Sequence, residues 1–273
     1  MALCAGMVLA LVSGDRSVAA RVAFPSVAFV VECAPSHQAA DDPIVHPGHG
    51  GTSHQHQFFG NRSTSAASTV ETLKRSTTTC SDHDDLAAYW VPTPVGARWI
   101  GMRAYYDAGL VDPATISAPT LGLKMLAGEV RSKSPQGLAT VAWSCGRSVD
   151  ATGWSRNAMG CRNGRDLRVR VTFAQCWSGK TRADGTADLV PAHVSECPVT
   201  HSIALPRLRL LLDLSGALTS FSSGDVNGMH ADFWNGWNTV RLQRLIDVCI
   251  KGQRLTNRDQ AQCRPSGGEP ESQ

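Results

Sequence analysis

The sequence lacks several features that mark other classes of protein. Its 26 basic residues nearly balance its 23 acidic residues, so the net charge is only +3. A nucleic-acid-binding domain usually carries a clear basic excess, so we expect no nucleic-acid partner. Beyond the first residues there is no apolar run of about 20 residues, the length that a membrane-spanning helix needs. A chain of 273 residues, 42% of them hydrophobic, is still large enough to bury its own core.

Several catalytic motifs are also missing. The sequence contains no Gly-x-Ser-x-Gly elbow, His-Glu-x-x-His motif, phosphate-binding loop or dinucleotide fingerprint. Glutamate is scarce, and its positions are Glu32, Glu71, Glu129, Glu196, Glu269 and Glu271. A carboxylate pair of the kind that cleaves glycosidic bonds would therefore have to use aspartates.

The chain opens with a short apolar run that closes on Val18-Ala19-Ala20, before Arg21. A short apolar run that ends on small residues is typical of a secretory signal peptide. We therefore expect residues 1–20 to be removed, and the protein to be secreted, extracellular and without a membrane span.

Nine cysteines are more than an ordinary cytosolic enzyme carries. Cys4 lies in the expected signal peptide, and an even number in the exported remainder predicts four disulfides. Pairing of consecutive cysteines is one of many possible arrangements. No two cysteines have the spacing of a zinc knuckle, which excludes that kind of site. The eight expected disulfide cysteines are Cys33, Cys80, Cys145, Cys161, Cys176, Cys197, Cys249 and Cys263.

Alternating hydrophobicity predicts a mostly β fold. Over residues 167–173 apolar side chains alternate with Arg168, Arg170 and Thr172, which is typical of a half-buried strand with one face in water. Further strands are expected at 27–31, 99–106, 121–126, 139–144 and 205–212. Turn-forming residues separate them, so we expect a single-domain sandwich or jelly-roll-like fold that disulfides stabilise.

Few helices are expected in this fold. Ser68 and Glu71 have capping-box spacing for a short helix through Arg75. A second helix is expected from Val240 to Lys251, with Cys249 on its buried face. The single globular domain should span residues 21–263, followed by a disordered tail over 264–273.

Two glycine-rich segments concentrate histidine and aspartate. His54 and His56 are two residues apart, so on an extended chain they project to the same face. His230 and Asp232 have the same spacing, and the two pairs together offer three nitrogens and one oxygen to a divalent metal ion. In the alternative interpretation these histidines only brace the loops, through hydrogen bonds to Asp42 and Asp225 or to the backbone.

The same residues are candidates for catalysis without a metal. Histidine and aspartate in one cleft act as general base and acid when burial or a neighbour tunes their pKa values. The candidate catalytic residues are His54, His56, His230, Asp232, Asp42 and Asp225.

The sequence is richer in tryptophan than in tyrosine, with seven of the former and three of the latter. Trp234 and Trp237 flank a turn beside His230, and exposed indoles there, with Tyr89, would form a platform that stacks on sugar rings. The alternative is that these aromatic side chains fill the core.

Five blocks of the sequence carry a family resemblance. They are residues 41–61, 89–92, 123–128, 197–201 and 223–237. In this order they resemble a secreted microbial family catalogued as domain of unknown function nineteen ninety-six, over roughly residues 40–263. Its members are largely exported fungal and bacterial proteins, sometimes joined to carbohydrate-binding or wall-attachment domains. The resemblance therefore implies secretion and a polysaccharide or cell-wall glycan as partner, and it implies no particular reaction.

These observations favour a secreted monomer that acts on an extracellular polysaccharide as a hydrolase or lyase. The expected catalyst is the His/Asp cluster, with one divalent metal ion as its expected cofactor. A non-catalytic glycan- or wall-binding module is the alternative, and a purely structural secreted domain is the third hypothesis.

Overall fold

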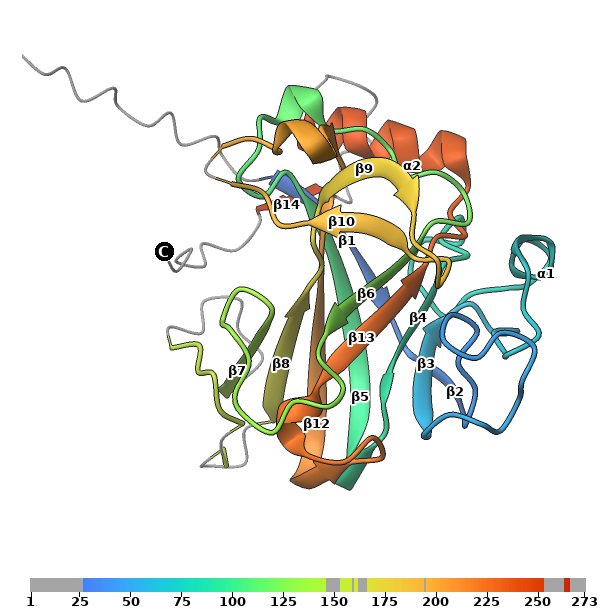
Figure 1. Ribbon diagram of the computed structural model, residues 1–273, viewed down its shortest axis with the longest axis vertical. Helices are drawn as coiled ribbons and strands as arrows, with labels where there is room; N and C mark the ends of the chain where they lie inside the picture. The colour runs from blue at the N-terminus through green and yellow to red at the C-terminus, as the bar shows by residue number, and fades with distance from the viewer. Residues whose placement is uncertain are drawn as a thin grey trace, which may run out of the picture.

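A computed structural model (Figure 1) describes residues 27–145, 153–158, 160–161, 166–193, 195–252 and 263–265. The expected signal peptide over residues 1–20 lies outside this part of the chain. Within the described part, no helix is both long enough and apolar enough to cross a membrane.

The first layer of the fold is a six-stranded antiparallel sheet. Its strand order is β14-β1-β5-β12-β8-β7. The long strands β5 and β12 pair over most of their length and form the centre of the sheet. The bounds are β1 Val27–Cys33, β5 Pro94–Asp107, β7 Val141–Cys145, β8 Leu167–Thr172, β12 Arg207–Phe221 and β14 Cys263–Pro265.

The second layer is a five-stranded sheet with the order β2-β3-β4-β13-β6. Its bounds are β2 Pro35–Ala39, β3 His56–Gly60, β4 Ala88–Pro92, β6 Lys124–Gly128 and β13 His230–Trp234. A small third sheet has the order β10-β9-β11, with β9 Cys176–Thr181, β10 Ala187–Val190 and β11 Ile203–Ala204.

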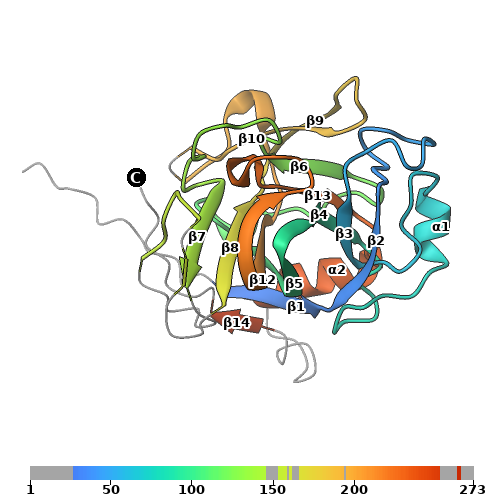
Figure 2. The same cartoon turned by 90° about the horizontal axis from the view of Figure 1, so that it is seen from below.

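The two larger sheets enclose one hydrophobic core. Phe29 and Leu210 from the first sheet and Phe59 and Phe233 from the second belong to the same buried cluster. Figure 2 shows the sheets curving around a shared interior. The expected mostly β fold is confirmed, and its architecture is a sandwich of antiparallel sheets.

One face of β8 differs from the half-exposed strand that the sequence predicted. Its apolar residues point into the core as expected, but Arg168 and Arg170 are also buried. Arg168 Nε donates to Asp213 Oδ1 at 2.8 Å. Arg170 donates to Leu138 O at 3.0 Å and lies 4.7 Å from the ring centre of Trp154. The prediction of a solvent face was wrong because an aspartate, a carbonyl and an aromatic ring, rather than water, surround these arginines.

Two short α-helices accompany the sheets. α1 runs over Val70–Lys74, and its N-cap is Thr69 instead of the expected Ser68, with Thr72 completing the capping box. α2 runs over Thr239–Leu245 and continues as a π-helical turn over Ile246–Ile250, so the second expected helix is present. Gly252, with φ of +70°, follows its end.

Four disulfides join consecutive cysteines, as one of the possible pairings had it. They are Cys33–Cys80, Cys145–Cys161, Cys176–Cys197 and Cys249–Cys263. The last one ties the helical segment to β14, so residues 264 and 265 of the expected tail belong to a strand that pairs with β1. Residues 266–273 lie outside the described part of the chain.

Candidate functional site

The candidate site lies on the face of the five-stranded sheet that points away from the core. Ala231 and Phe233 of β13 enter the core. His230 and Asp232 therefore point to the opposite face, since side chains alternate along a strand. His56 of β3 lies on this same face, because Phe59 enters the core and the β3–β4 and β4–β13 registers align the rows of side chains.

A loop over residues 40–55 covers part of this face. Ile44 of this loop packs in a second apolar cluster, together with Phe58, Leu73, Ala88, Trp90 and Trp234. Asp42 starts the turn: its Oδ1 accepts hydrogen bonds from the N–H groups of Ile44 at 2.9 Å and Val45 at 3.0 Å. The anchored loop thus carries the carboxylate of Asp42 to the histidines.

Five of the six expected catalytic residues meet here. His54 Nε2 lies 3.2 Å from His230 Nε2, and the ring centroids of His54 and His56 are 4.1 Å apart. One ligand atom from each of His54, His56 and His230 fits within 4.8 Å of the others, and the same holds for Asp42, His56 and Asp232. His56 is shared by both groups, so the five residues form one contiguous cluster.

Backbone carbonyls orient two of the imidazoles. His56 Nδ1 donates to Asp41 O at 2.9 Å, and His230 Nδ1 donates to Gly228 O at 2.8 Å. Because a carbonyl can only accept, the free lone pair of each neutral ring is on Nε2. Within the described residues, His56 Nε2 and Asp232 Oδ2 are buried atoms without a hydrogen-bond partner.

Burial favours the uncharged forms of the three histidines and of Asp232. Desolvation, with the neighbouring His230, lowers the pKa of His54 to about 4. Desolvation and the adjacent His54 lower the pKa of His56 to about 2. Burial also lowers the pKa of His230, while burial and the nearby Asp42 raise the pKa of Asp232 well above its usual range. At neutral pH, therefore, the imidazoles are free bases, and the raised pKa of Asp232 favours the protonated form of its carboxyl group.

The donor set fits a divalent metal ion. Imidazole nitrogens with a carboxylate suit zinc and other borderline metals. A metal-binding histidine ordinarily donates its second N–H to a carbonyl or carboxylate, which is the arrangement of His56 and His230. The unpartnered atoms His56 Nε2 and Asp232 Oδ2 are those that an ion would satisfy. Loop bracing explains the two Nδ1 contacts but leaves these two atoms without a role.

Asp225 is not one of the clustered residues. Its Oδ1 accepts from Asn227 N at 2.8 Å, and it caps the 3₁₀ turn Val226–Gly228 that leads into β13. The structure thus gives Asp225 a capping role and does not bring it to the other expected catalytic residues, and its catalytic role stays a prediction. The other side chains differ in access: His54 is partly exposed, whereas His56, His230, Asp42 and Asp232 are buried.

The expected aromatic platform is not exposed. Tyr89 and Trp237 are at most 1% exposed and belong to the main core, and Trp234 is buried against the second cluster. The prediction that these rings stack on sugars was wrong in this arrangement, and the core-filling alternative holds. The alternation of β4 and β13, together with their central place in the sheet, encloses the rings.

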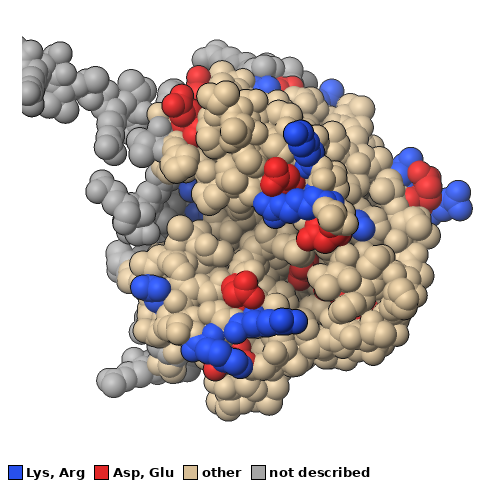
Figure 3. Space-filling view, viewed as in Figure 1, with Lys and Arg blue, Asp and Glu red and all other residues tan. Residues whose placement is uncertain are grey.

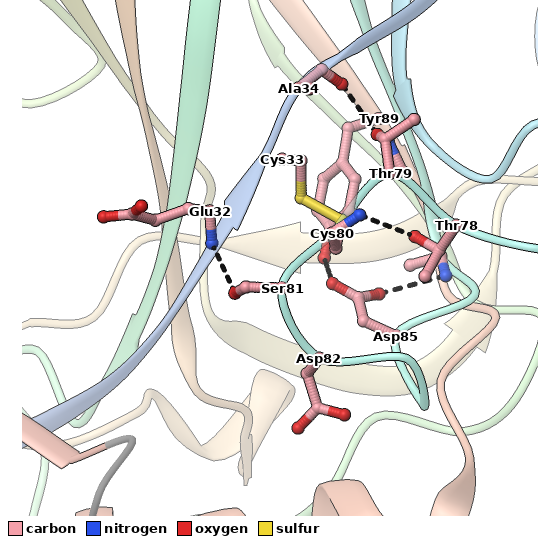
Figure 4. The surroundings of a disulfide bond; sticks show 12 residues. Glu32, Cys33, Ala34, Thr78, Thr79, Cys80, Ser81, Asp82, Asp85 and Tyr89 are labelled. Atoms are coloured by element: carbon pink, nitrogen blue, oxygen red, sulfur yellow. Dashed lines mark hydrogen bonds between the residues drawn. A yellow bond between two sulfur atoms is a disulfide. The ribbon is translucent and has the colours of Figure 1, made fainter.

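Tyr89 belongs to a buried polar chain that the sequence analysis missed. Trp237 Nε1 donates to Tyr106 Oη at 3.1 Å, the two tyrosine hydroxyls are 2.6 Å apart, and Tyr89 Oη donates to Asp85 at 2.8 Å. Figure 4 shows Asp85 next to the Cys33–Cys80 disulfide. No local sequence pattern predicts this series of hydrogen bonds, because its residues come from segments that are far apart in the sequence.

Asp41 and Lys124 are two further residues that sequence reasoning did not single out. The carboxylate of Asp41 accepts from the N–H groups of Gly51 and Ala66, both at 2.9 Å, while its carbonyl holds His56. Lys124 Nζ donates to Pro43 O at 3.3 Å and lies 4.2 Å from the ring centre of Trp234. Both residues hold the loop that carries Asp42.

Comparison with known proteins agrees with the resemblance noted in the sequence. A family described as "Domain of unknown function (DUF1996)" matches residues 42–237, which is more than half of the chain. Neither the curated proteins nor the solved structures include a match. The matched segment contains all five clustered residues, and the chain belongs to the DUF1996 family.

Proposed function

We propose that this protein is a secreted enzyme that cleaves an extracellular polysaccharide or cell-wall glycan, by hydrolysis or elimination, with one divalent metal ion. His54, His56, His230 and Asp232 would hold the ion. The observation that carries the proposal is that three uncharged imidazoles converge, and that His56 Nε2 and Asp232 Oδ2 are buried there without a hydrogen-bond partner among the described residues.

A metal ion in such a site lowers the pKa of bound water and polarises substrate oxygens. The residues of the chain supply the rest of the chemistry. Burial and the nearby Asp42 raise the pKa of Asp232, so a proton held on its carboxyl group would pass to solvent when that group holds the ion. Asp42 lies beside it as the second carboxylate, and the loop that carries it keeps water away from the buried side.

The assignment to secretion has two supports. Four disulfides suit an oxidising compartment. The apolar run before Arg21 has the features of a signal peptide. The assignment to glycans rests on the family resemblance, because the aromatic platform that suggested sugar stacking is buried. That burial also weakens the alternative of a non-catalytic glycan-binding module.

The proposal is tested by incubating the secreted protein with insoluble cell-wall glycans and measuring soluble fragments. We expect release that a chelator abolishes and added zinc or another borderline metal restores. His54→Ala should lose the activity, while His83→Ala, an exposed histidine outside the cluster, should keep it. Equal release by wild type and His54→Ala would refute the assigned catalyst.

A further inference from the structure

A cavity lies beside β6, one strand away from the His/Asp cluster. It has a volume of about 300 Å³ and borders Leu126, Ala127 and Gly128 of β6. In the sheet register Leu126 is opposite Asp232, and Gly128 is opposite His230. A polymer that reaches the cluster from the β6 side therefore passes this cavity, which is of a size to hold one substituent of the polymer.

The free edge of β6 faces the cavity. Asn235 N donates to Leu123 O at 2.8 Å. Because the backbone groups of successive residues point to opposite sides of a strand, the N–H and C=O groups of Met125 and Ala127 point toward β13. Leu126 and Gly128 then direct their N–H and C=O groups outward, to the side where the cavity lies. Among the described residues, none of the turn, loop and cap hydrogen bonds involves these groups, so the cavity offers a donor and an acceptor side by side.

The other walls are mainly apolar. Leu110, Phe173, Ala174 and Pro191 face the space, and the only charged residue among those that line it is Arg207. Such a cavity suits a small group that combines one amide with a methyl. It disfavours an ammonium group, which would lose its hydration there.

We infer that this cavity binds the N-acetyl group of a 2-acetamido sugar, so that the substrate of the proposed enzyme is an N-acetylated glycan. The amide would pair with the outward backbone groups of Leu126 and Gly128, and the methyl would pack against the apolar walls. Charged side chains on the face drawn in Figure 3 are scattered and of both signs, which suits a neutral polymer. The inference rests on the proposed function for the reaction, but the cavity is a separate binding site.

The test is calorimetric binding of a trimer of N-acetylglucosamine and of its de-N-acetylated counterpart to the full protein. We expect the acetylated trimer to bind at least about tenfold more tightly, because the de-N-acetylated trimer would leave the backbone groups of the cavity without a hydrogen-bond partner. Ala174→Leu fills the cavity and should abolish the preference, while the exposed control Ala217→Leu should retain it. In nuclear magnetic resonance spectra, the amide signals of Leu126 and Gly128 should shift with the acetylated trimer.

Equal binding of the two trimers would overturn the inference, and so would a preference that survives Ala174→Leu without shifts at Leu126 and Gly128. If Ala174→Leu fails to fold, the amide shifts of the wild type decide. His54→Ala separates the two proposals, because it should lose activity and retain the preference for the acetylated trimer. A preference in a wild-type protein without metal or activity would refute the proposed function and leave the cavity assignment standing.

Discussion

His56 links the two halves of the cluster, since it belongs both to the three-histidine group and to the group with the two aspartates. Its position depends on a backbone atom, Asp41 O, which accepts from Nδ1. The spacing of His54 and His56 predicted that they share a face, and the matching spacing of His230 and Asp232 predicted the partner pair. The carbonyl that fixes the ring has no sequence signature, so its role emerges only from the fold.

Asp41→Ala is expected to weaken metal binding without removing a ligand. The substitution deletes the bonds to Gly51 and Ala66 that fix the loop, so the carbonyl that orients His56 is free to move. Loss of such an orienting contact typically costs about 10–100-fold in metal affinity. Titration with zinc measures it, with Asp112→Ala, another capping aspartate, as the control. Unchanged affinity in Asp41→Ala would contradict this role.

Asp85 predicts a pH dependence of stability. Burial raises its pKa to about 8, above its value of about 4 in an unfolded chain. Between these values the native state holds a proton that the unfolded state has released. The free energy of unfolding should therefore fall as pH rises through this range, by at most about 1.4 kcal/mol per pH unit from this group.

Asp85→Asn should remove this contribution to the slope, as measured by urea unfolding at pH 5, 6, 7 and 8. Asp112→Asn, an exposed capping aspartate, should leave the slope of the wild type unchanged. Parallel curves for wild type and Asp85→Asn would show that Asp85 titrates normally.

At the scale of elements, alternation located the strands but not their surroundings. The pattern over residues 167–173 correctly predicted β8, and its apolar side chains enter the core. Charged residues that alternate with apolar ones predict a solvent-exposed face. The pattern contains no information about a partner on a neighbouring strand, such as Asp213. Likewise the tryptophans of β13 and the following turn were recognisable as aromatic, but only the position of β13 inside its sheet makes them buried.

The ion pair on β8 carries a prediction of its own. Arg168→Met should destabilise the protein by less than about 3–5 kcal/mol, the cost of breaking an isolated buried pair, because the carboxylate of Asp213 loses Arg168 but keeps its ion pair with Arg103 at 3.2 Å. The double variant Arg168→Met/Asp213→Leu should recover much of this loss, since it removes both charges. Chemical unfolding measures both variants. A double variant as unstable as the single one would show that the cost lies in packing instead of charge.

At the scale of the whole molecule, two sheets provide a core while one outer face carries the candidate site. The antiparallel pairing of β3, β4 and β13 over a shared core sets their register, and the register brings His56 and His230 together although they are far apart in sequence. Composition and spacing predicted this meeting. They did not predict that Asp225 caps a turn outside the cluster, or that the aromatic rings are buried, because capping and exposure depend on the assembled fold.

Whether the cluster holds a metal ion is decided by elemental analysis of the purified native protein. We expect about one borderline transition-metal ion per chain in the wild type and in His83→Ala, and its loss in both His54→Ala and His230→Ala. Wild-type protein without metal, or folded His54→Ala and His230→Ala variants that retain the full amount, would contradict it.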